Sequence, residues 1–321
     1  MPALRLFVGL FLIICWPVAA TAQGEYPSRP VKIVVGFGPG SAADLTARIL
    51  AQRLSLTMGQ QFFIENKPGG GSTVAAEQVA RSPKDGYTLF MGTVANVING
   101  VLQPDLDLDF ARDFAPIVYA TSSPNILVVH PSTGVSNVKD LISLLKANPG
   151  KIFYGSSGVG TSPHLSGELF NMLAGTQMVH VPYSGSAQAV TDLIAGRTQV
   201  MFSPASTVLQ YVASERLVAL ASTERERGSV APDLPTVAEA GLPGFDTSVW
   251  FGLVAPAGTP PYVVTRLSQS IDDALRNDEV TKTLHAAGLD IKGGTPERFG
   301  AFIAAETRKW NDVVIAAGLR K

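Results

Sequence analysis

The sequence predicts an α/β protein of two parts, each built on a mostly parallel sheet flanked by helices. Three observations lead to this prediction. Short β-branched segments alternate with segments of helical periodicity, which is the pattern of βαβ units. Two strand–glycine loop–helix units correspond to each other, over residues 32–54 and 151–173. The chain of 321 residues is too long for one ordinary domain and suits two.

The individual elements follow from periodicity and from breaking residues. Residues 32–37 (KIVVGF) are a β-branched run that ends at a Gly-Pro-Gly turn, which is typical of a buried strand. Further strands are predicted on the same grounds over residues 62–65, 87–92, 125–130, 151–156, 177–182, 199–202, 217–222 and 247–256. Helices are predicted where apolar residues recur at three- and four-residue spacing, from residue 42 and from residue 162, and over 74–81, 138–147, 187–194, 263–276 and 296–315.

The N-terminus has the features of a signal peptide, assigned to residues 1–22. Arg5 precedes an apolar run of 11 residues, 6–16, which is shorter than the roughly 20 residues that span a bilayer. The small residues Ala20-Thr21-Ala22 fit a cleavage site, so we expect a periplasmic mature chain that starts at Gln23. The alternative is an uncleaved membrane anchor. We expect the mature protein to be soluble and monomeric.

Composition excludes several classes of function. The 25 Lys and Arg residues balance 26 Asp and Glu residues, and no basic cluster occurs, so nucleic acid is not the expected partner. The one cysteine, Cys15, lies in the predicted signal peptide, which excludes disulfides and thiol chemistry from the mature chain. The four histidines show no metal-ligand spacing. We expect no cofactor and no metal.

Two glycine-rich loops are the strongest candidates for a binding site. Each follows a predicted strand and opens a predicted helix, over residues 36–43 and 155–165, and neither contains Lys or Arg. Helix N-termini present unpaired N–H groups and a partial positive charge, so they bind anions. An anion here would rest on N–H dipoles and on the hydroxyls of Ser41, Ser156, Ser157, Thr161 and Ser162, with His164 as a further contact. The alternative is that both loops are plain βα turns.

Two enzyme classes remain as alternatives. Gly38, Gly40 and Ala43 form a G-x-G-x-x-A pattern, and Glu65 ends the next strand, as in a Rossmann-type oxidoreductase. The signal peptide and the missing N–H of Pro39 weigh against that class. An exported serine hydrolase would use Ser162 or Ser157, but no G-x-S-x-G elbow occurs and no acid can be placed beside His164.

The chain resembles the solute receptors of tripartite tricarboxylate transporters, also called Bug receptors. The resemblance covers nearly the whole predicted mature chain, in the order of the family. The matching segments are YPSRPVKIVVGFGPG (26–40), ENKPGGG (65–71), SPKDGYTL (82–89), DFAPI (113–117), GSSGVGTSPHLSGELF (155–170), HVPYSGSAQAVTDLIAG (180–196), PDLPTVAEAGLPGF (232–245) and KWNDVVIAAGL (309–319).

This resemblance implies a type II-like periplasmic binding protein with a ligand cleft between two lobes. Lobe 1 would comprise residues 23–123 and 249–321, and lobe 2 residues 124–248, with crossings near 122–125 and 245–250. The implied partners are a mono- or dicarboxylate ligand, aromatic acids included, and the membrane permease subunits. The implied ligand-binding residues are Gly38, Pro39, Gly40, Ser41, Gly70, Gly71, Ser72, Thr93, Ser156, Ser157, Gly160, Thr161, Ser162, His164, Tyr183 and Ser203.

Two departures from the family pattern concern the ligand. Ser41 stands where the family has a second glycine after the proline of the first loop. Ser203 stands where the family commonly has an acid that can meet an amino or other polar group of the ligand. The missing acid argues against amino-acid ligands and favours plain or aromatic carboxylates.

Overall fold

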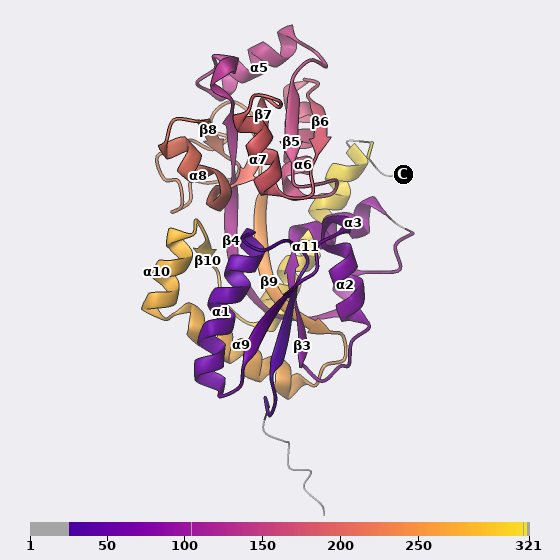
Figure 1. The fold of residues 1–321 in the computed structure, drawn as a ribbon. Helices are drawn as coiled ribbons and strands as arrows, with labels where there is room; N and C mark the ends of the chain where they lie inside the picture. The colour runs from indigo at the N-terminus through magenta and orange to yellow at the C-terminus, as the bar shows by residue number, and fades with distance from the viewer. Residues whose placement is uncertain (1–25, 104, 317, 320–321) are drawn as a thin grey trace, which may run out of the picture.

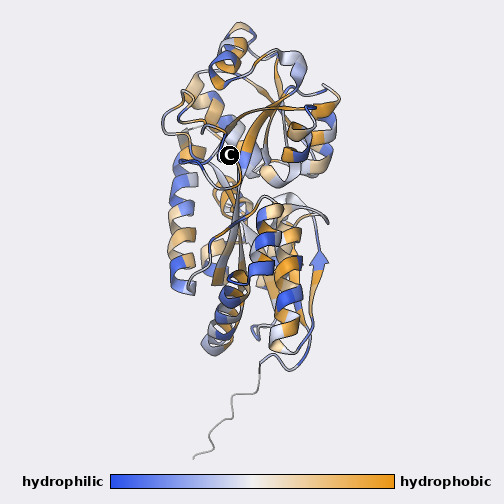
Figure 2. Ribbon diagram, turned by 90° about the vertical axis from the view of Figure 1, so that its left-hand side faces the viewer, coloured by the Kyte–Doolittle hydropathy of each residue, from blue (hydrophilic) through white to orange (hydrophobic). Residues whose placement is uncertain are grey.

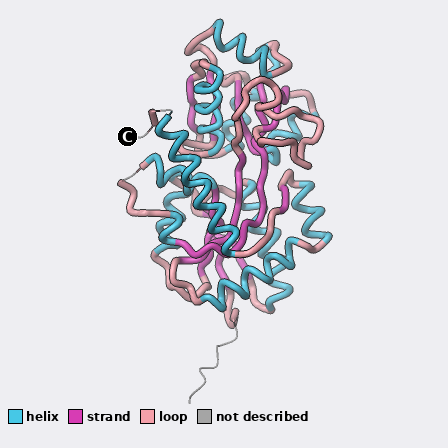
Figure 3. The backbone as a smooth tube through the Cα atoms, turned by 180° about the vertical axis from the view of Figure 1, so that it is seen from behind, coloured by secondary structure: helices cyan, strands magenta, loops and turns pink. Residues whose placement is uncertain are grey.

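The computed structural model describes residues 26–103, 105–316 and 318–319, so the predicted signal peptide lies outside the described residues. In these residues the helices and strands form two α/β groups, a lower and an upper one in Figure 1. Two long strands connect the groups, as Figure 3 shows from behind. No helix of the described ranges is both long enough and apolar enough to span a membrane.

The lower group begins with two βαβ crossovers, as predicted. Strand β1 pairs in parallel with β2 on one side and with β3 on the other. Helices α1 and α2 lie on opposite faces of this sheet (Figure 1). The bounds are β1 (Val31–Val35), α1 (Ala42–Met58), β2 (Phe62–Asn66), the short turn η1 (Gly70–Ser72), α2 (Thr73–Ala80), β3 (Thr88–Thr93) and α3 (Val94–Leu102).

The upper group repeats this arrangement. Strand β5 pairs in parallel with β6 and with β7, and each of these strands leads directly into a helix. The bounds are η2 (Pro131–Thr133), α5 (Val138–Ala147), β5 (Phe153–Ser156), α6 (Ser162–Ala174), β6 (Val179–Pro182), α7 (Ser186–Ile194), β7 (Val200–Pro204), α8 (Ala205–Ala213) and β8 (Val218–Ser222).

Two antiparallel strands join the groups into one mixed sheet. Strand β4 (Phe114–Val129) pairs with β9 (Ser248–Pro256) along its first part and with β7 and β8 along its last part. The strand order is β2-β1-β3-β9-β4-β7-β5-β6, with β8 and β10 paired to β4. The parallel pairs therefore lie in the outer strands. The remaining elements are α4 (Phe110–Asp113), α9 (Pro261–Leu275), α10 (Asp278–Ala286), β10 (Asp290–Ile291) and α11 (Pro296–Ala316).

The apolar core follows the two-residue period of the strands. One cluster fills the lower group and contains the buried side chains of Trp250 and Trp310. The upper group has two clusters, one on each face of its sheet. Leu127 of β4 belongs to one of them and its neighbour Val128 to the other, because successive side chains of a strand point to opposite faces. Figure 2 shows the corresponding pattern, with apolar strands inside and helices that carry polar residues on one side.

Several elements were not predicted. Helix α3 has the sequence VANVINGVL, whose apolar residues 94, 97, 98, 101 and 102 recur at helical spacing, so it could have been predicted despite its two asparagines and its glycine. Its formation depends on tertiary burial and on a capping box in which Thr93 and Asn96 satisfy each other's backbone N–H groups. The first half of β4, together with α4, α8, α10 and β10, was also missed.

A carboxyl pair lies where the upper group meets β10. Glu224 follows β8, and Asp290 belongs to β10. A Cβ atom added to Gly228 would lie 2.5 Å from Glu224 Oε2 and 3.3 Å from Asp290 Oδ2, so both carboxyl groups border one small space. Burial, together with the nearby charge of Asp290, raises the pKa of Glu224 to about 7, while Lys292 acts in the opposite direction.

We expect Glu224 to make folding stability depend on pH. The pKa of this carboxyl group is higher in the folded state than in the unfolded state. Its contribution to stability is therefore fully present at pH values below the unfolded-state pKa. That contribution is lost as pH rises toward and through about 7. Glu224→Gln should therefore unfold with a free energy about 1–3 kcal/mol higher than wild type at pH 8, and should flatten the decline between pH 5 and pH 8.

Urea unfolding at several pH values measures this difference. Glu226→Gln, an exposed neighbour, is the matched control and should keep the wild-type slope. Identical pH profiles for wild type and Glu224→Gln would contradict the assignment.

Candidate ligand-binding cleft

A cavity of about 410 Å³ lies between the two groups. Its lower wall comes from the segments that follow β1 and β3, its upper wall from those that follow β5, β6 and β7, and Val249 and Phe251 of β9 contribute as well. Among the described residues that line it there is no Asp, Glu, Lys, Arg or His. Any charge on a ligand must therefore be met by neutral groups.

Five helices begin at this cavity. Lining residues include the first residues of α1, α3, α6 and α7 and the first turn of α8. The carboxyl ends of the strands before them face the cavity, which is where α/β proteins bind ligands. Side chains cap α1 and α3, whereas α6, α7 and α8 have no side-chain cap. In the described residues no side-chain cap therefore satisfies the first N–H groups of these three helices, of which Pro163 in α6 has none.

The first loop is held by a buried carboxylate. Asp44, which is 1% exposed, accepts hydrogen bonds from the N–H of Gly40 at 2.9 Å, from Arg48 Nε at 2.9 Å and from Asn66 Nδ2 at 2.8 Å. Burial opposes ionisation, but these hydrogen bonds prevail and hold the pKa of Asp44 below its usual range. The N–H of Gly40 therefore points into the protein. Ser41 Oγ caps α1 by accepting from the N–H of Asp44 at 3.3 Å.

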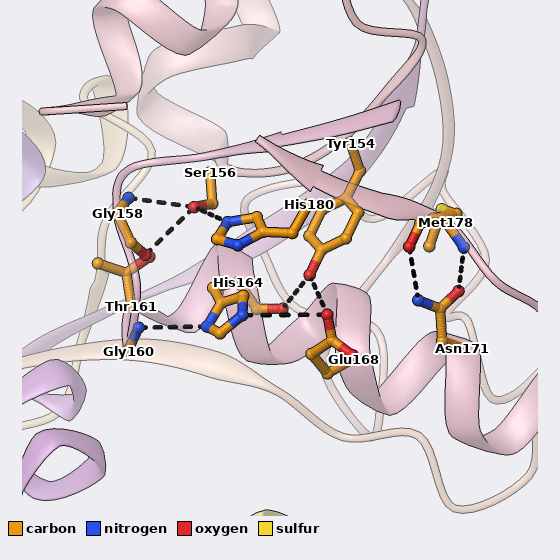
Figure 4. A network of polar contacts seen from close by, with 10 residues as sticks. All are labelled: Tyr154, Ser156, Gly158, Gly160, Thr161, His164, Glu168, Asn171, Met178 and His180. Atoms are coloured by element: carbon orange, nitrogen blue, oxygen red, sulfur yellow. Dashed lines mark hydrogen bonds and ion pairs between the residues drawn. The ribbon is translucent and has the colours of Figure 1, made fainter. Parts of the chain in front are cut away.

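The second loop is held from behind by two histidines, which Figure 4 shows. The N–H of Gly160 donates to His164 Nδ1 at 3.2 Å. The N–H of Gly158 donates to Ser156 Oγ at 3.1 Å, and that oxygen lies 2.6 Å from His180 Nε2. His164 was predicted as a ligand contact, yet it is 6% exposed and does not line the cavity.

Both histidines are neutral at neutral pH. Their rings stack with centroids 4.0 Å apart. Burial lowers the pKa of His164 to about 4, and burial together with the neighbouring His164 lowers the pKa of His180 to about 3. Glu168 Oε1 lies 3.9 Å from His164 Nε2 and also accepts a hydrogen bond from the hydroxyl of Tyr154 at 2.6 Å. A neutral ring is required here, because Nδ1 of His164 must accept a hydrogen bond from Gly160.

The structure brings eight of the predicted site residues together at the cavity: Gly38, Pro39, Gly40, Ser41, Thr93, Ser157, Thr161 and Ser162. The other eight lie outside the lining: Gly70, Gly71, Ser72, Ser156, Gly160, His164, Tyr183 and Ser203. Tyr183, for example, donates its hydroxyl to Asp192 Oδ2 at 2.9 Å. Ser203 is fully buried in β7.

Sequence reasoning missed the part of the cavity formed by α7, α8 and β9. Ser184, Gly185, Ser186 and Gln188 at the start of α7 line the cavity, as does Thr207 of α8. The segment SGSAQ after β6 repeats the pattern of a strand, a glycine and a helix, and it could have been recognised from that. Phe37 and Phe251 give no comparable indication, because aromatic residues in strands or next to them usually belong to the core.

The arrangement does not fit the enzyme alternatives. Glu65 is ion-paired to Lys32 Nζ at 2.9 Å and does not line the cavity, so it is not placed to hold a ribose. Ser162 Oγ accepts a hydrogen bond from Asn125 Nδ2 at 2.6 Å, while His164 Nδ1 accepts one from the N–H of Gly160. Ser162 and His164 are therefore bonded to other groups and not to each other as a serine hydrolase requires. The part of the chain that the structure describes contains no group of three His, Cys, Asp or Glu residues that could hold a metal.

Two α/β groups, two connecting strands and a cavity between the groups define a solute-binding protein. Comparison with known proteins identifies its family. The model of the tripartite tricarboxylate transporter family receptor matches residues 46–319, and the chain belongs to that family. The chain is therefore a solute-binding receptor, as the resemblance in its motifs implies, and not an enzyme.

Individual relatives are similar to this chain over almost their full length. Protein BugT of Bordetella pertussis is 32% identical over 322 residues, which cover 100% of this chain and 99% of BugT. The structure of Rpa4515 of R. palustris with adipate has a TM-score of 0.87 at 37% identity and covers 91% of this chain and 98% of its own. MatC of Rhodopseudomonas palustris with bound malate has a TM-score of 0.84 at 30% identity, and the match covers 90% of this chain and 100% of MatC.

We expect His164 to hold the second loop through its ring nitrogen. His164→Leu removes the acceptor of the Gly160 N–H, and a lost hydrogen bond of about 1 kcal/mol should speed exchange of that amide about fivefold. His164→Asn retains an acceptor near the position of Nδ1 and should restore most of the protection. Hydrogen exchange of residues 157–162 measures the effect. Equal exchange in both variants would contradict this role.

Proposed function

We propose that this chain captures a small organic carboxylate in the cleft and delivers it to a tripartite transporter in the membrane. One observation carries the proposal: helix N-termini from both groups open onto a cavity whose described lining contains no charged residue. Helix N-termini stabilise an anion through N–H groups and aligned dipoles. Such a site binds an anion without a buried ion pair and leaves no unpaired buried charge when the ligand departs.

The lining indicates what else the ligand carries. Phe37, Phe251 and Val249 provide apolar contacts, and no acid is present to meet an amino group. Ser203, where the family commonly has an acid, is buried in β7. Adipate and malate in the related structures are both dicarboxylates without an amino group. We therefore propose mono- or dicarboxylates, aromatic acids included, and disfavour amino acids.

The location and the moving parts belong to the same proposal. The mature receptor acts in the periplasm after cleavage of residues 1–22, and it passes its ligand to the permease subunits. Residues 23–123 with 249–321 move as lobe 1, and residues 124–248 move as lobe 2. The hinge lies where β4 and β9 pass from one group to the other, near the pair Pro124 and Ser248.

Calorimetry of the purified protein against a panel of mono- and dicarboxylates tests the binding function. Gly40→Val should abolish binding, because a Cβ at Gly40 meets nothing within 4 Å and its side chain would occupy open space of the cavity. Gly59→Val is the matched control. Gly59 has φ 71° against 81° for Gly40, has equally open surroundings and lies outside the cavity.

Comparison of the two variants separates the effect of backbone strain from the effect of a side chain that fills the cavity. Both variants place valine in a left-handed backbone conformation, so both should lose similar stability. Only Gly40→Val should lose the ligand. Wild-type affinity in folded Gly40→Val would place the site elsewhere.

Small-angle scattering tests the lobe movement. Saturating ligand should reduce the radius of gyration of the wild-type protein, because hinge closure brings the lobes together. An unchanged radius with calorimetrically proven binding would count against closure.

A further inference from the structure

Asn99 occupies a position between the two groups, outside the cavity lining. It belongs to α3 of the lower group and is 1% exposed. Its Nδ2 lies within hydrogen-bond distance of three acceptors of the lower group, namely Gly70 O at 3.2 Å, Gly71 O at 3.1 Å and Thr73 Oγ1 at 3.1 Å. The amide nitrogen therefore fixes the side chain against the turn that precedes α2, and Oδ1 faces the opposite way.

The face of Asn99 that carries Oδ1 meets the second loop of the upper group. A Cβ atom added to Gly160 would lie 2.0 Å from Asn99 Oδ1 and 3.4 Å from Leu102 Cδ1. A Cβ atom added to Gly71 would lie 2.8 Å from Asn99 Nδ2 and 3.4 Å from the carbonyl oxygen of Val159. The Asn99 amide thus lies between one glycine from each group, and a Cβ atom at either glycine would collide with it unless the amide or the backbone moved.

Apolar packing reinforces this contact. Leu165 of α6, in the upper group, is fully buried and packs in the apolar cluster of the lower group. The second loop lies just before α6, and the N–H of Gly160 is held from behind by His164. The loop is therefore supported on one side by its own group and meets Asn99 of the other group on the other side.

We propose that Asn99 is a positioning residue for closure. In the closed state the side chain of Asn99 in one lobe contacts the backbone of Gly160 in the other lobe, and this contact limits how far the lobes close. This inference rests on the proposed function, because it assumes that the lobes open and close around a ligand. Contact between Asn99 and Gly160 stops the movement where Thr161 and Ser162, the next residues, reach the cavity. A side chain at position 160 leaves the closed state less populated, and the apparent affinity falls by the same factor.

A double-mutant cycle measures the contact. Gly160→Ala should raise Kd at least tenfold in the wild-type background, because its methyl group collides with Asn99 Oδ1. In the Asn99→Ala background that collision is removed, and Gly160→Ala should raise Kd less than threefold. Gly160 has φ 78°, so alanine is strained there, but this strain acts in both backgrounds and cancels from the cycle.

Gly158→Ala is the matched control within the same loop. Gly158 also has a positive φ, 129°, but a Cβ atom there meets only Tyr183 and Thr161 of its own group within 4 Å. Its effect on Kd should be the same with and without Asn99. An equal effect of Gly160→Ala in both backgrounds would overturn the proposal.

A cross-linking experiment gives a readout that needs no ligand. In the chain with Cys15→Ser, the pair Asn99→Cys and Gly160→Cys should oxidise to a disulfide at least tenfold faster than the control pair Asn99→Cys and Gly158→Cys. Failure to cross-link faster than the control would overturn the contact itself. Rapid cross-linking in a protein that binds no carboxylate of the panel would instead refute the proposed function and leave the contact established.

Discussion

The pairing of β4 with β9 is the constraint on which the rest of the structure depends. The two strands pair from Phe114 and Pro256 to Pro124 and Ser248, and β4 then continues into the upper group, where it pairs with β7 and β8. Each group contributes strands whose carboxyl ends face the other group. The helices that follow those strands therefore begin at the space between the groups, and the cavity results from this topology.

The titratable side chains that hold the two loops lie outside the lining of the cavity. Asp44 and His164 hold the two loops in shape, yet neither side chain lines the cavity. Hydrogen bonds keep Asp44 ionised and burial keeps His164 neutral, so each presents to its loop an acceptor for a backbone N–H. The cavity itself is left with dipoles and hydroxyls. A receptor that must release its ligand benefits from this arrangement, because no unpaired buried cation remains when the anion leaves.

The site shows how far a local pattern can predict a contact. The two glycine loops were identified correctly as βα turns at helix N-termini, because glycine, serine and proline after a β-branched run report on local backbone geometry. His164 lies in the first turn of α6, and its position in the sequence is equally compatible with facing the cavity or the protein interior. The stacking on His180 and the bond to Gly160 decide between them, and both depend on how β5, β6 and α6 pack.

The sequence by itself determined the βαβ units, the neutral loops and the family, because these depend on residues close together in the chain or on motifs in series. The tertiary structure alone decided which residues of distant segments meet. Strands β4 and β9 run antiparallel to their neighbours, and Asn99 lies against Gly160 where the two groups meet. Contacts between residues 61 positions apart carry no local periodicity or breaking residue, so only the folded arrangement of the strands brings them together.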